Sequence, residues 1–572
     1  MTLPAPRPDA DQGAACSFAA SEDGSLTILG VFMFGLMLVA GGVALDAMRA
    51  ERQRAALQTT VDRGVLAATS LDQERPGDVV MRDYLRAADI PEDAVTIDAF
   101  DNGSERRMAV DAVASTPSLF MGALGVDRLE QPIRASAIEV RTEVELSLVV
   151  DISGSMSGSK IARLRTAGSE FVGKLLQGRE DRTYVSLVPY NEWVNLGRIM
   201  PRYFPMQATH DHSRCVVFDD ADYRRLDHPE GAILQRKGHF DKDSSGNSLG
   251  PIVKPECTLG STAEVLPWSN NVAELQARIG ALRDGGSTGM NVGAKVGLML
   301  LDPSARPRLQ QMLADTTLPL AQRVDPVFLQ RPTEYGTPGT HKVLVLMTDG
   351  VNNTQRDLRP QYKSGPSTVY VFQERRNHAC DDDGIPDDCT DFRPSGPPAA
   401  AAHPFGTASN PDVSTSSLSP RYSFWSESRG KWYVHHNKTW VDAPFGGTEA
   451  MQLAWQDLLA VAPARWLVDS LLKDSDSATR AQYSGLWHET HKRSGAVTPL
   501  ADKNLADVCT KAREAGVVIY TIAFQAPTEG RNAMRNCAGH EHPDRYFDVQ
   551  GLDIDTAFDD ILAHVSRLRL TR

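Results

Sequence analysis

The sequence is poor in cysteine and has no excess of positive charge. Its 572 residues include seven cysteines, and none of them forms the tight C-x-x-C spacing of structural zinc sites. A zinc-dependent fold is therefore not expected. The formal net charge is −13, with acidic and basic residues mixed along the chain. That balance argues against nucleic-acid binding.

Two catalytic signatures are incomplete. The glycines between Gly154 and Lys160 lack the Gly-x-x-x-x-Gly-Lys-Ser/Thr spacing of a phosphate loop, which argues against nucleotide hydrolysis. The segment His488–His491 is one residue short of His-Glu-x-x-His, so its histidines cannot hold a metalloprotease zinc one helical turn apart. We expect a solvated helix face there. Four further histidines in polar loops show no fixed spacing and receive no predicted role: His210, His212, His540 and His542.

One uncharged hydrophobic run covers residues 24–45, after a polar tail at residues 1–23. As a helix, these 22 residues would span roughly 33 Å, which is enough to cross a bilayer core. A cleaved signal peptide is the alternative, but its apolar part is normally about 7–15 residues long. The sequence therefore predicts a retained transmembrane helix.

The segment Asp151-Ile-Ser-Gly-Ser155 offers one carboxylate and two hydroxyls at alternate positions. An apolar run at 144–150 precedes it and predicts a buried strand. Residues 160–176 follow with helical periodicity. Open α/β sheets place their ligand sites in such loops, at the carboxyl ends of strands. Hard oxygen ligands suit Mg²⁺, although a Ser-rich helix cap is the simpler interpretation.

Two later stretches favour the metal site. One is Gly285–Asn291, ahead of a helical run at 292–301, and the other is Lys342–Gly350, an apolar strand that ends in Asp-Gly. With the first loop, they resemble the von Willebrand factor A (vWA) domain and its metal-ion-dependent adhesion site (MIDAS). The resemblance assigns these metal ligands: Asp151, Ser153, Ser155, Thr288 and Asp349.

A site of this family binds Mg²⁺, or Mn²⁺ in its place, and leaves a coordination position open for an acidic residue of a protein ligand. The resemblance therefore implies a binding protein rather than an enzyme. Two alternatives remain open. In one, the metal only braces the loops of a structural envelope scaffold. In the other, the chain is a metal-dependent hydrolase, but no nucleophile or general base is evident near these motifs.

Apolar strands that alternate with helices predict an α/β fold with a doubly wound, mainly parallel sheet over residues 143–572. Two stretches interrupt this pattern and are interpreted as insertions, at about 201–267 and 351–500. Residues 46–142 predict a helical extension of the membrane span, followed by a small α+β module. A hairpin signal around Asp101-Asn-Gly-Ser104 belongs to that module.

The membrane span and its flanks resemble the N-terminal region of TadE/TadG-like proteins of the Tad (Flp) pilus system. The residues that carry the resemblance are Glu22–Ser25, Gly42–Asp46, Leu57-Gln58, Val61-Asp62 and Gly64–Ala68. Joined to a vWA-like domain, this pattern resembles that of TadG-like proteins. It implies a single-pass protein of the inner (cytoplasmic) membrane with its C-terminal domain in the periplasm. Pilus assembly components and the membrane are the implied partners, with no role for nucleic acid.

The charges near the span disagree with that orientation. Arg49, Arg52 and Arg54 follow the span and only Arg7 precedes it, so the positive-inside tendency would place the C-terminal side in the cytoplasm. Six cysteines lie beyond the span, and an even set indicates disulfides and an oxidising compartment. The cysteines and the resemblance favour the periplasm.

Six cysteines allow 15 pairings. Proximity in sequence favours three sequential disulfides and leaves Cys16 free. The predicted pairs are Cys215–Cys257, Cys380–Cys389 and Cys509–Cys537.

The second insertion contains two distinctive segments. Asp381, Asp383 and Asp387 lie between two cysteines in a stretch that resembles one thrombospondin type 3 repeat, which predicts a weak Ca²⁺ loop. Ala379 and Thr390 depart from the ligand pattern, and an acidic, disulfide-closed turn is the alternative. Residues 422–445 are rich in aromatic side chains. They predict the core of a small inserted module, with a glycan- or protein-binding surface as the alternative.

Overall fold

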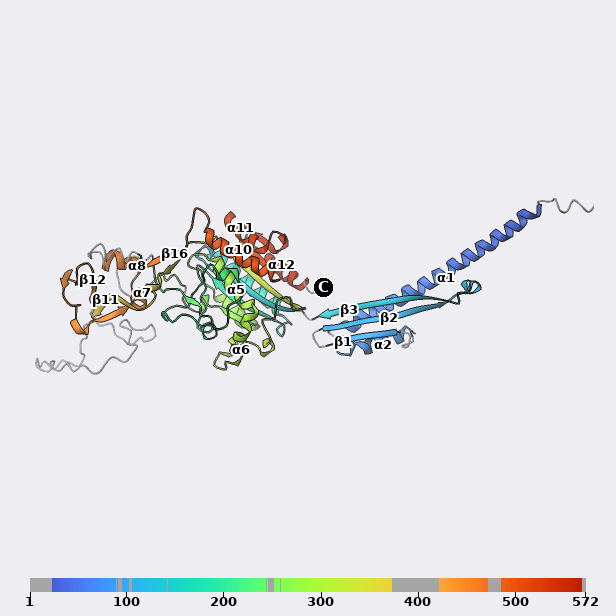
Figure 1. Cartoon of the computed structure of the whole chain (residues 1–572), viewed down its shortest axis with the longest axis horizontal. Coiled ribbons are helices and arrows are strands. Elements are labelled where there is room, and N and C mark those ends of the chain that lie inside the picture. The colour runs from blue at the N-terminus through green and yellow to red at the C-terminus, as the bar shows by residue number, and fades with distance from the viewer. Residues whose placement is uncertain are drawn as a thin grey trace, which may run out of the picture. The chain divides into compact units, whose positions relative to one another are not determined.

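The computed structural model describes residues 23–567, except for 72, 89, 91–94, 102–104, 141, 243, 245–251, 258, 373–420 and 472–484. It divides into two compact units, residues 1–141 and 142–572 (Figure 1).

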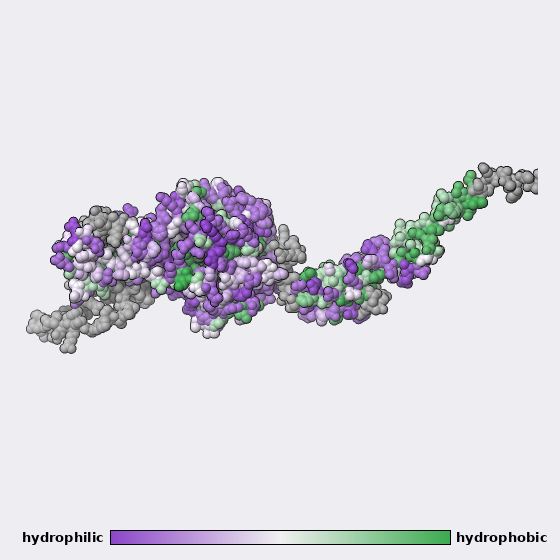
Figure 2. All heavy atoms as spheres, viewed as in Figure 1, coloured by the Kyte–Doolittle hydropathy of each residue, from purple (hydrophilic) through white to green (hydrophobic). Residues whose placement is uncertain are grey.

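The first unit is built on one long helix, α1 (Asp23–Thr69), which contains the predicted membrane span and continues without a break into the predicted extension. It is the one helix in the described part of the chain that is long and apolar enough to cross a membrane. The hydrophobic side chains of its N-terminal half are exposed (Figure 2). A single helix of this kind fits a single-pass membrane anchor.

The C-terminal half of α1 packs with α2 (Gly77–Ala87) against a three-stranded antiparallel sheet in the order β1-β2-β3. The strands are β1 (Val95–Asp101), β2 (Glu105–Pro117) and β3 (Arg128–Val140). β3 runs across Pro132, which an edge strand tolerates because one side of its backbone makes no ladder hydrogen bonds. The small core of this unit includes Val61, Val65, Met81, Leu85, Met108, Val110 and Ile133.

The second unit is organised around a six-stranded sheet in the order β18-β17-β9-β4-β5-β8. All neighbouring strands in it are parallel except the edge pair β5 and β8, which is antiparallel. The strands are β4 (Glu143–Asp151), β5 (Thr183–Tyr190), β8 (Leu266–Ser269), β9 (Thr340–Thr348), β17 (Val518–Phe524) and β18 (Tyr546–Val549).

Helices cover both faces of this sheet. Along β4, Leu146, Leu148 and Val150 face one hydrophobic core, whereas Val149 faces the other. Burial on both faces explains why these strands read as continuous apolar runs. The first core packs against α3 (Ser159–Leu176), α4 (Val272–Ala281) and α12 (Ile554–Arg567). The second packs against α5 (Met290–Leu301), α10 (Pro499–Glu514) and α11 (Thr528–Ala538).

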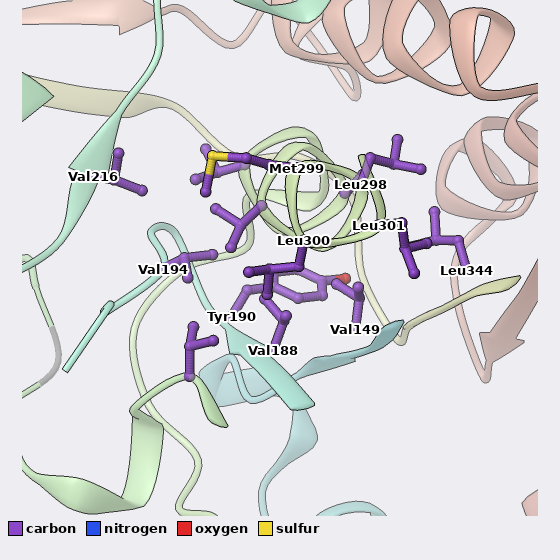
Figure 3. Close-up of a cluster of buried hydrophobic side chains, with 14 of the residues drawn as sticks. Val149, Val188, Tyr190, Val194, Val216, Leu298, Met299, Leu300, Leu301 and Leu344 are labelled. Carbon is purple, nitrogen blue, oxygen red and sulfur yellow. The ribbon is translucent and has the colours of Figure 1, made fainter. Parts of the chain in front are cut away.

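Helix α5 lies directly on the central strands (Figure 3). Every one of its residues is buried. Two glycines permit this close approach. A Cβ atom at Gly293 would lie 2.7 Å from the Tyr190 ring, and one at Gly297 would lie 2.5 Å from a methyl group of Val149. The Ser147 hydroxyl also donates a hydrogen bond to the Gly297 carbonyl at 2.7 Å. These contacts fix the helix that begins just after Thr288.

The first insertion packs on the α5 side of the sheet. It contains the short pair β6 (Val216–Val217) and β7 (Gln235–Arg236), and Tyr223 and Phe204 join the same core as α5. After the insertion and α5, α6 (Arg306–Ala314) leads toward β9.

The second insertion contains its own core. A ribbon of β10 (Gln355–Leu358) and β16 (Trp487–His491) pairs the two ends of the segment. Between them is a five-stranded antiparallel sheet in the order β14-β13-β12-β11-β15. Its elements are β11 (Pro366–Phe372), β12 (Arg421–Ser426), β13 (Lys431–Val434), β14 (Thr439–Val441) and β15 (Met451–Ala454), with α7 (Trp455–Val461) and α8 (Ala464–Trp466). Tyr422, Phe424 and Tyr433 are buried in this core, as the core interpretation of residues 422–445 predicts.

One local prediction is wrong. Residues 488–491 form most of strand β16 rather than a solvated helix face. His491 is buried and lies 3.0 Å from the Asn504 side-chain amide through its Nε2 atom. Pairing with β10 decides the conformation here, because four polar residues have no hydrophobic period that distinguishes a strand from a helix.

Two of the three predicted disulfides are confirmed, Cys215–Cys257 within the first insertion and Cys509–Cys537 between α10 and α11. The third predicted pair, Cys380–Cys389, lies outside the described residues. So do Cys16 and the predicted calcium ligands Asp381, Asp383 and Asp387.

Candidate metal centre

Three separate segments bring polar side chains to the carboxyl edge of the central strands. β4 ends at Asp151, and β9 ends one residue before Asp349. The two strands are adjacent and parallel, with Val150 opposite Met347, so both carboxylates leave the sheet at the same edge. The segment that ends at Thr288 enters α5 from the same side, since the Gly154 amide donates to the Gly286 carbonyl at 2.9 Å.

Hydrogen bonds link the loop Asp151–Ser155 to Asp349. The Ser153 amide donates to Asp151 Oδ1 at 2.7 Å. The hydroxyls of Ser153 and Ser155 are 3.0 Å apart, and the Ser155 hydroxyl donates to Asp349 Oδ1 at 2.6 Å. Four of the five predicted ligands therefore form one connected network.

The fifth, Thr288, lies at the same place. A Cβ atom on Gly350 would be 3.2 Å from the Thr288 hydroxyl oxygen and 3.7 Å from that of Ser155. The Thr288 carbonyl also accepts a hydrogen bond from the Asn353 amide at 2.9 Å, which ties this segment to the loop after β9. Glycine at position 350 keeps the space between the two hydroxyls open.

Two buried carboxyl groups repel each other at this site. Asp151 and Asp349 are both buried. The pKa of the Asp151 carboxyl is raised to about 7, mainly because the group is buried and secondly because of the nearby charge of Asp349. Two carboxylates held in this way favour a cation between them.

Two further residues belong to this site. The Thr348 hydroxyl donates to Asp151 Oδ2 at 2.8 Å, and the Lys160 ammonium donates to Asp349 Oδ2 at 2.7 Å. The Asp349 side chain is fully buried and that of Lys160 is 20% exposed. In the sequence, Lys160 belongs to an incomplete phosphate-loop pattern and opens the helical run at 160–176, and neither feature predicts its pairing with Asp349. The spacing of the α3 N-terminus from Asp151 was the signal that could have placed it here.

The donor set fits a hard divalent cation. Two carboxylates and three hydroxyls are all oxygen ligands, the type that Mg²⁺ and Mn²⁺ prefer. Within the described ranges, no group of three or more His, Cys, Asp or Glu side chains is placed to hold a metal ion. A cation at this edge would therefore depend on the hydroxyls of Ser153, Ser155 and Thr288 as well as on the carboxylates.

A cavity of about 670 Å³ lies beside the Thr288 segment. Its wall is shared between Gly285–Ser287, Glu192 at the end of β5, and residues 252–256 and 259 of the first insertion. The pKa of the Glu192 carboxyl is raised, mainly because the group is buried and secondly because of the nearby charge of Glu256. The cavity therefore carries less negative charge than its two glutamates suggest.

The structure also brings together His210 and His212, for which the sequence predicts no role, and His239, which no sequence motif singles out. The ring centroids of His210, His212 and His239 are 5.3–6.0 Å apart, although the residues are spread over 30 positions. Burial lowers the pKa of His210 to about 4 and that of His239 to about 3, so both rings are neutral at pH 7. All three lie in the first insertion, and His212 Nε2 is also 3.4 Å from Asp457 Oδ1 in the second insertion.

Comparison with known protein families gives one match. Residues 24–73 match the Tad family, described as "Putative Flp pilus-assembly TadE/G-like". This segment is α1 with its immediate continuation, so the predicted TadE/TadG-like resemblance is confirmed for the N-terminal segment. No curated protein matches the chain.

Solved structures with some likeness to the chain include three from bacterial pili. The vWF domain of the type V pili tip protein Mfa5 from Porphyromonas gingivalis aligns with 13% identity and a TM-score of 0.30, over 76% of this chain and 98% of that domain. The pilus adhesin SpaC from Lactobacillus rhamnosus GG aligns with 14% identity and a TM-score of 0.26, over 83% of this chain and 34% of SpaC.

The adhesive tip pilin GBS104 from Group B Streptococcus agalactiae aligns with 12% identity and a TM-score of 0.27, over 74% of this chain and all of that one. At this identity and TM-score, none of the three defines the fold or the function of this chain.

Proposed function

We propose that the chain is a membrane-anchored Tad/Flp pilus assembly or adhesion protein. In this proposal its second unit is a vWA domain that binds a protein ligand through a metal site. Mg²⁺, or Mn²⁺ in its place, is held by Asp151, Ser153, Ser155, Thr288 and Asp349. The observation that carries the proposal is the convergence of these five oxygen-bearing side chains, from three distant segments, at one edge of the sheet.

In this arrangement the hydroxyls of Ser153, Ser155 and Thr288 bind the cation directly, and Asp151 and Asp349 act on it through water. A divalent cation whose direct ligands are neutral oxygens keeps much of its positive charge and attracts an anionic group from outside. The proposed ligand therefore presents an Asp or Glu carboxylate to the metal. The neighbouring cavity offers space for residues that flank that carboxylate, and a protonated Glu192 would reduce repulsion of an acidic ligand.

A binding role agrees better with this site than a catalytic one. Hydrolysis would need a nucleophile or general base placed beside the cation and open to a substrate. Asp151 and Asp349 are both buried and are proposed to face the cation, so neither is left to act on a substrate.

The proposed location is the inner membrane, with the folded units in the periplasm. The TadE/G-like segment supports membrane anchoring. Two disulfides in the second unit support an oxidising compartment. Three arginines follow the span, at positions 49, 52 and 54, and this orientation requires their translocation.

Metal-dependent thermal stabilisation of the full chain tests the site. Binding to the folded state alone stabilises by about 2.7 kcal/mol when the ion is at 100 times its Kd. Millimolar Mg²⁺ or Mn²⁺ should therefore raise the unfolding temperature of the wild type. Asp151→Ala and Asp349→Ala should abolish the rise. Ser157→Ala should keep it, because Ser157 is exposed on the same loop but lies outside the network.

A pull-down from envelope extract, with and without chelator, separates ligand binding from a purely structural metal. Chelator should release the captured protein, and Thr288→Ala should weaken capture more than it weakens metal binding. If the metal stabilises the wild type but capture is the same with chelator, the scaffold alternative is correct. If Asp151→Ala retains the full stabilisation by the ion, the five residues are not a metal site.

A further inference from the structure

The turn between β2 and β3 carries an uncharged, exposed apolar surface. Residues 118–126 read Ser-Leu-Phe-Met-Gly-Ala-Leu-Gly-Val and include no charged side chain. Four of them, Leu119, Phe120, Leu124 and Val126, are 65%, 47%, 59% and 36% exposed. We name these four residues the turn patch. A cluster of exposed apolar side chains of this kind is a candidate contact surface for a membrane or another protein.

The turn is fixed to α1 at one level. The Asp46 carboxylate accepts hydrogen bonds from the backbone amides of Leu119, Phe120 and Met121 at 2.7–3.0 Å and is itself buried. Phe120 lies against Gly42, where a Cβ atom would be 2.5 Å from the Phe120 ring. Both contacts fall where the apolar part of α1 ends.

That level coincides with the edge of a membrane if α1 crosses one. From Leu26 to Leu45 the helix rises about 30 Å, the thickness of a hydrocarbon core. A bilayer centred on this stretch would have one boundary at residues 42–46, beside the turn patch. The side chains of α1 before this level are apolar and exposed, so the turn patch continues the same surface.

The backbone of the turn suits the membrane interface. Amides that face hydrocarbon without a partner are strongly unfavourable. Asp46 satisfies three of them, and the Gly125 and Val126 amides donate to the carbonyls of Gly122 and Met121 at 3.1 and 3.0 Å. The same contacts bury the Asp46 charge, which would otherwise face the lipid at the end of the span.

We infer that the turn patch inserts into the lipid bilayer where the membrane helix emerges and forms a second membrane contact of this chain. In this arrangement the side chains of the turn patch contact the lipid acyl chains just beneath the headgroups. This inference rests on the proposed membrane anchoring of α1. The inserted turn then holds the first unit close to the membrane surface, because hydrogen bonds to Asp46 connect the turn to α1.

Quenching of tryptophan fluorescence by lipids with brominated acyl chains tests the inference in the full chain. All eight native tryptophans lie between residues 193 and 487, so the wild type, reconstituted in the same vesicles, supplies the background. The test variant is Leu124→Trp. Phe34→Trp, in the exposed apolar part of α1, is the positive control. Ile138→Trp, exposed on β3 about 33 Å along the strand from Arg128, is the negative control.

The added fluorescence of Leu124→Trp and Phe34→Trp should be quenched in brominated phosphatidylcholine vesicles, and that of Ile138→Trp should not. Quenching of Phe34→Trp without quenching of Leu124→Trp overturns the inference and leaves the anchor intact. A blue-shifted but unquenched Leu124→Trp signal would mean that protein, rather than lipid, covers the patch. If Phe34→Trp is not quenched, the anchor itself fails, and the inference fails with it. Equal quenching at Ile138 refutes a contact confined to the turn.

Discussion

Lys160 is a cation that belongs to the protein and pairs with a predicted metal ligand. Its ammonium lies 2.7 Å from Asp349 Oδ2, and the carboxylate is fully buried. If the divalent ion and the ammonium compete for Asp349, replacing Lys160 by methionine should have two opposite effects. The protein without metal should become less stable, and its affinity for the metal should rise.

The size of both effects follows from burial. Removing one partner of a buried ion pair costs about 3–5 kcal/mol. Lys160 is partly exposed and Ser155 still donates to Asp349, so we expect the lower part of that range or slightly less, about 2–3 kcal/mol. In the Lys160→Met variant the ion has no ammonium to displace, so its binding free energy should become more favourable by the same amount. At 1.4 kcal/mol for each factor of ten, 2 kcal/mol corresponds to about a 30-fold tighter Kd.

Calorimetric titration with Mn²⁺, and thermal unfolding with and without the ion, measure both effects on the full chain. Lys174→Met is the matched control on the same helix, because its pairing with Asp559 is on the surface, where ion pairs contribute about 0–1 kcal/mol. The control should leave both quantities nearly unchanged. A Lys160→Met protein with wild-type stability and an equal or weaker Mn²⁺ affinity would refute competition at Asp349.

Three other predictions concern stability and topology. Replacing Cys509 and Cys537 by alanine removes a cross-link between residues 28 positions apart and should lower the free energy of unfolding by about 3–4 kcal/mol in denaturant titrations. An unchanged free energy of unfolding would contradict the argument that the cross-link restricts the unfolded chain. Gly297→Ala should destabilise by about 1–3 kcal/mol because its methyl group meets Val149, although alanine favours helices. The control Gly280→Ala, with open space around it on α4, should stabilise by about 0.5–1 kcal/mol, and the same sign for both changes would contradict the packing argument. At Arg572, a fused reporter that works only in the periplasm should be active, and one that works only in the cytoplasm should be inactive. The opposite result would overturn the proposed orientation.

The central sheet was predictable because its strands carry a strong signal. Burial on both faces produces uninterrupted apolar runs such as Val144–Val150, and each run stops where the chain turns polar at Asp151 or Asp349. Parallel neighbours bring such ends to one edge. The placement of Thr288 came from the resemblance to the vWA domain, because its segment connects helices α4 and α5 and follows no strand end that would predict it.

The features that sequence reasoning missed depend on contacts between distant segments. β16 has no hydrophobic period of its own and becomes a strand through pairing with β10. His239 joins His210 only because the first insertion folds back on itself, as the hydrogen bond from the His210 ring to the Lys237 carbonyl illustrates. The bond between Asp46 and the turn at Leu119 spans 73 positions, and no local pattern reports a contact of that kind.

The continuity of α1 has a mechanical consequence. Its 47 residues form one unbroken helix of about 70 Å, of which the first part is exposed and apolar and the last part is packed into the first unit. A helix transmits tilt and rotation along its axis because each turn is hydrogen-bonded to the next. A pull or twist applied to the folded part is therefore delivered directly to the apolar part, without a hinge to absorb it. If α1 crosses a membrane, a load on the folded part of the first unit would therefore change the depth and tilt of the span.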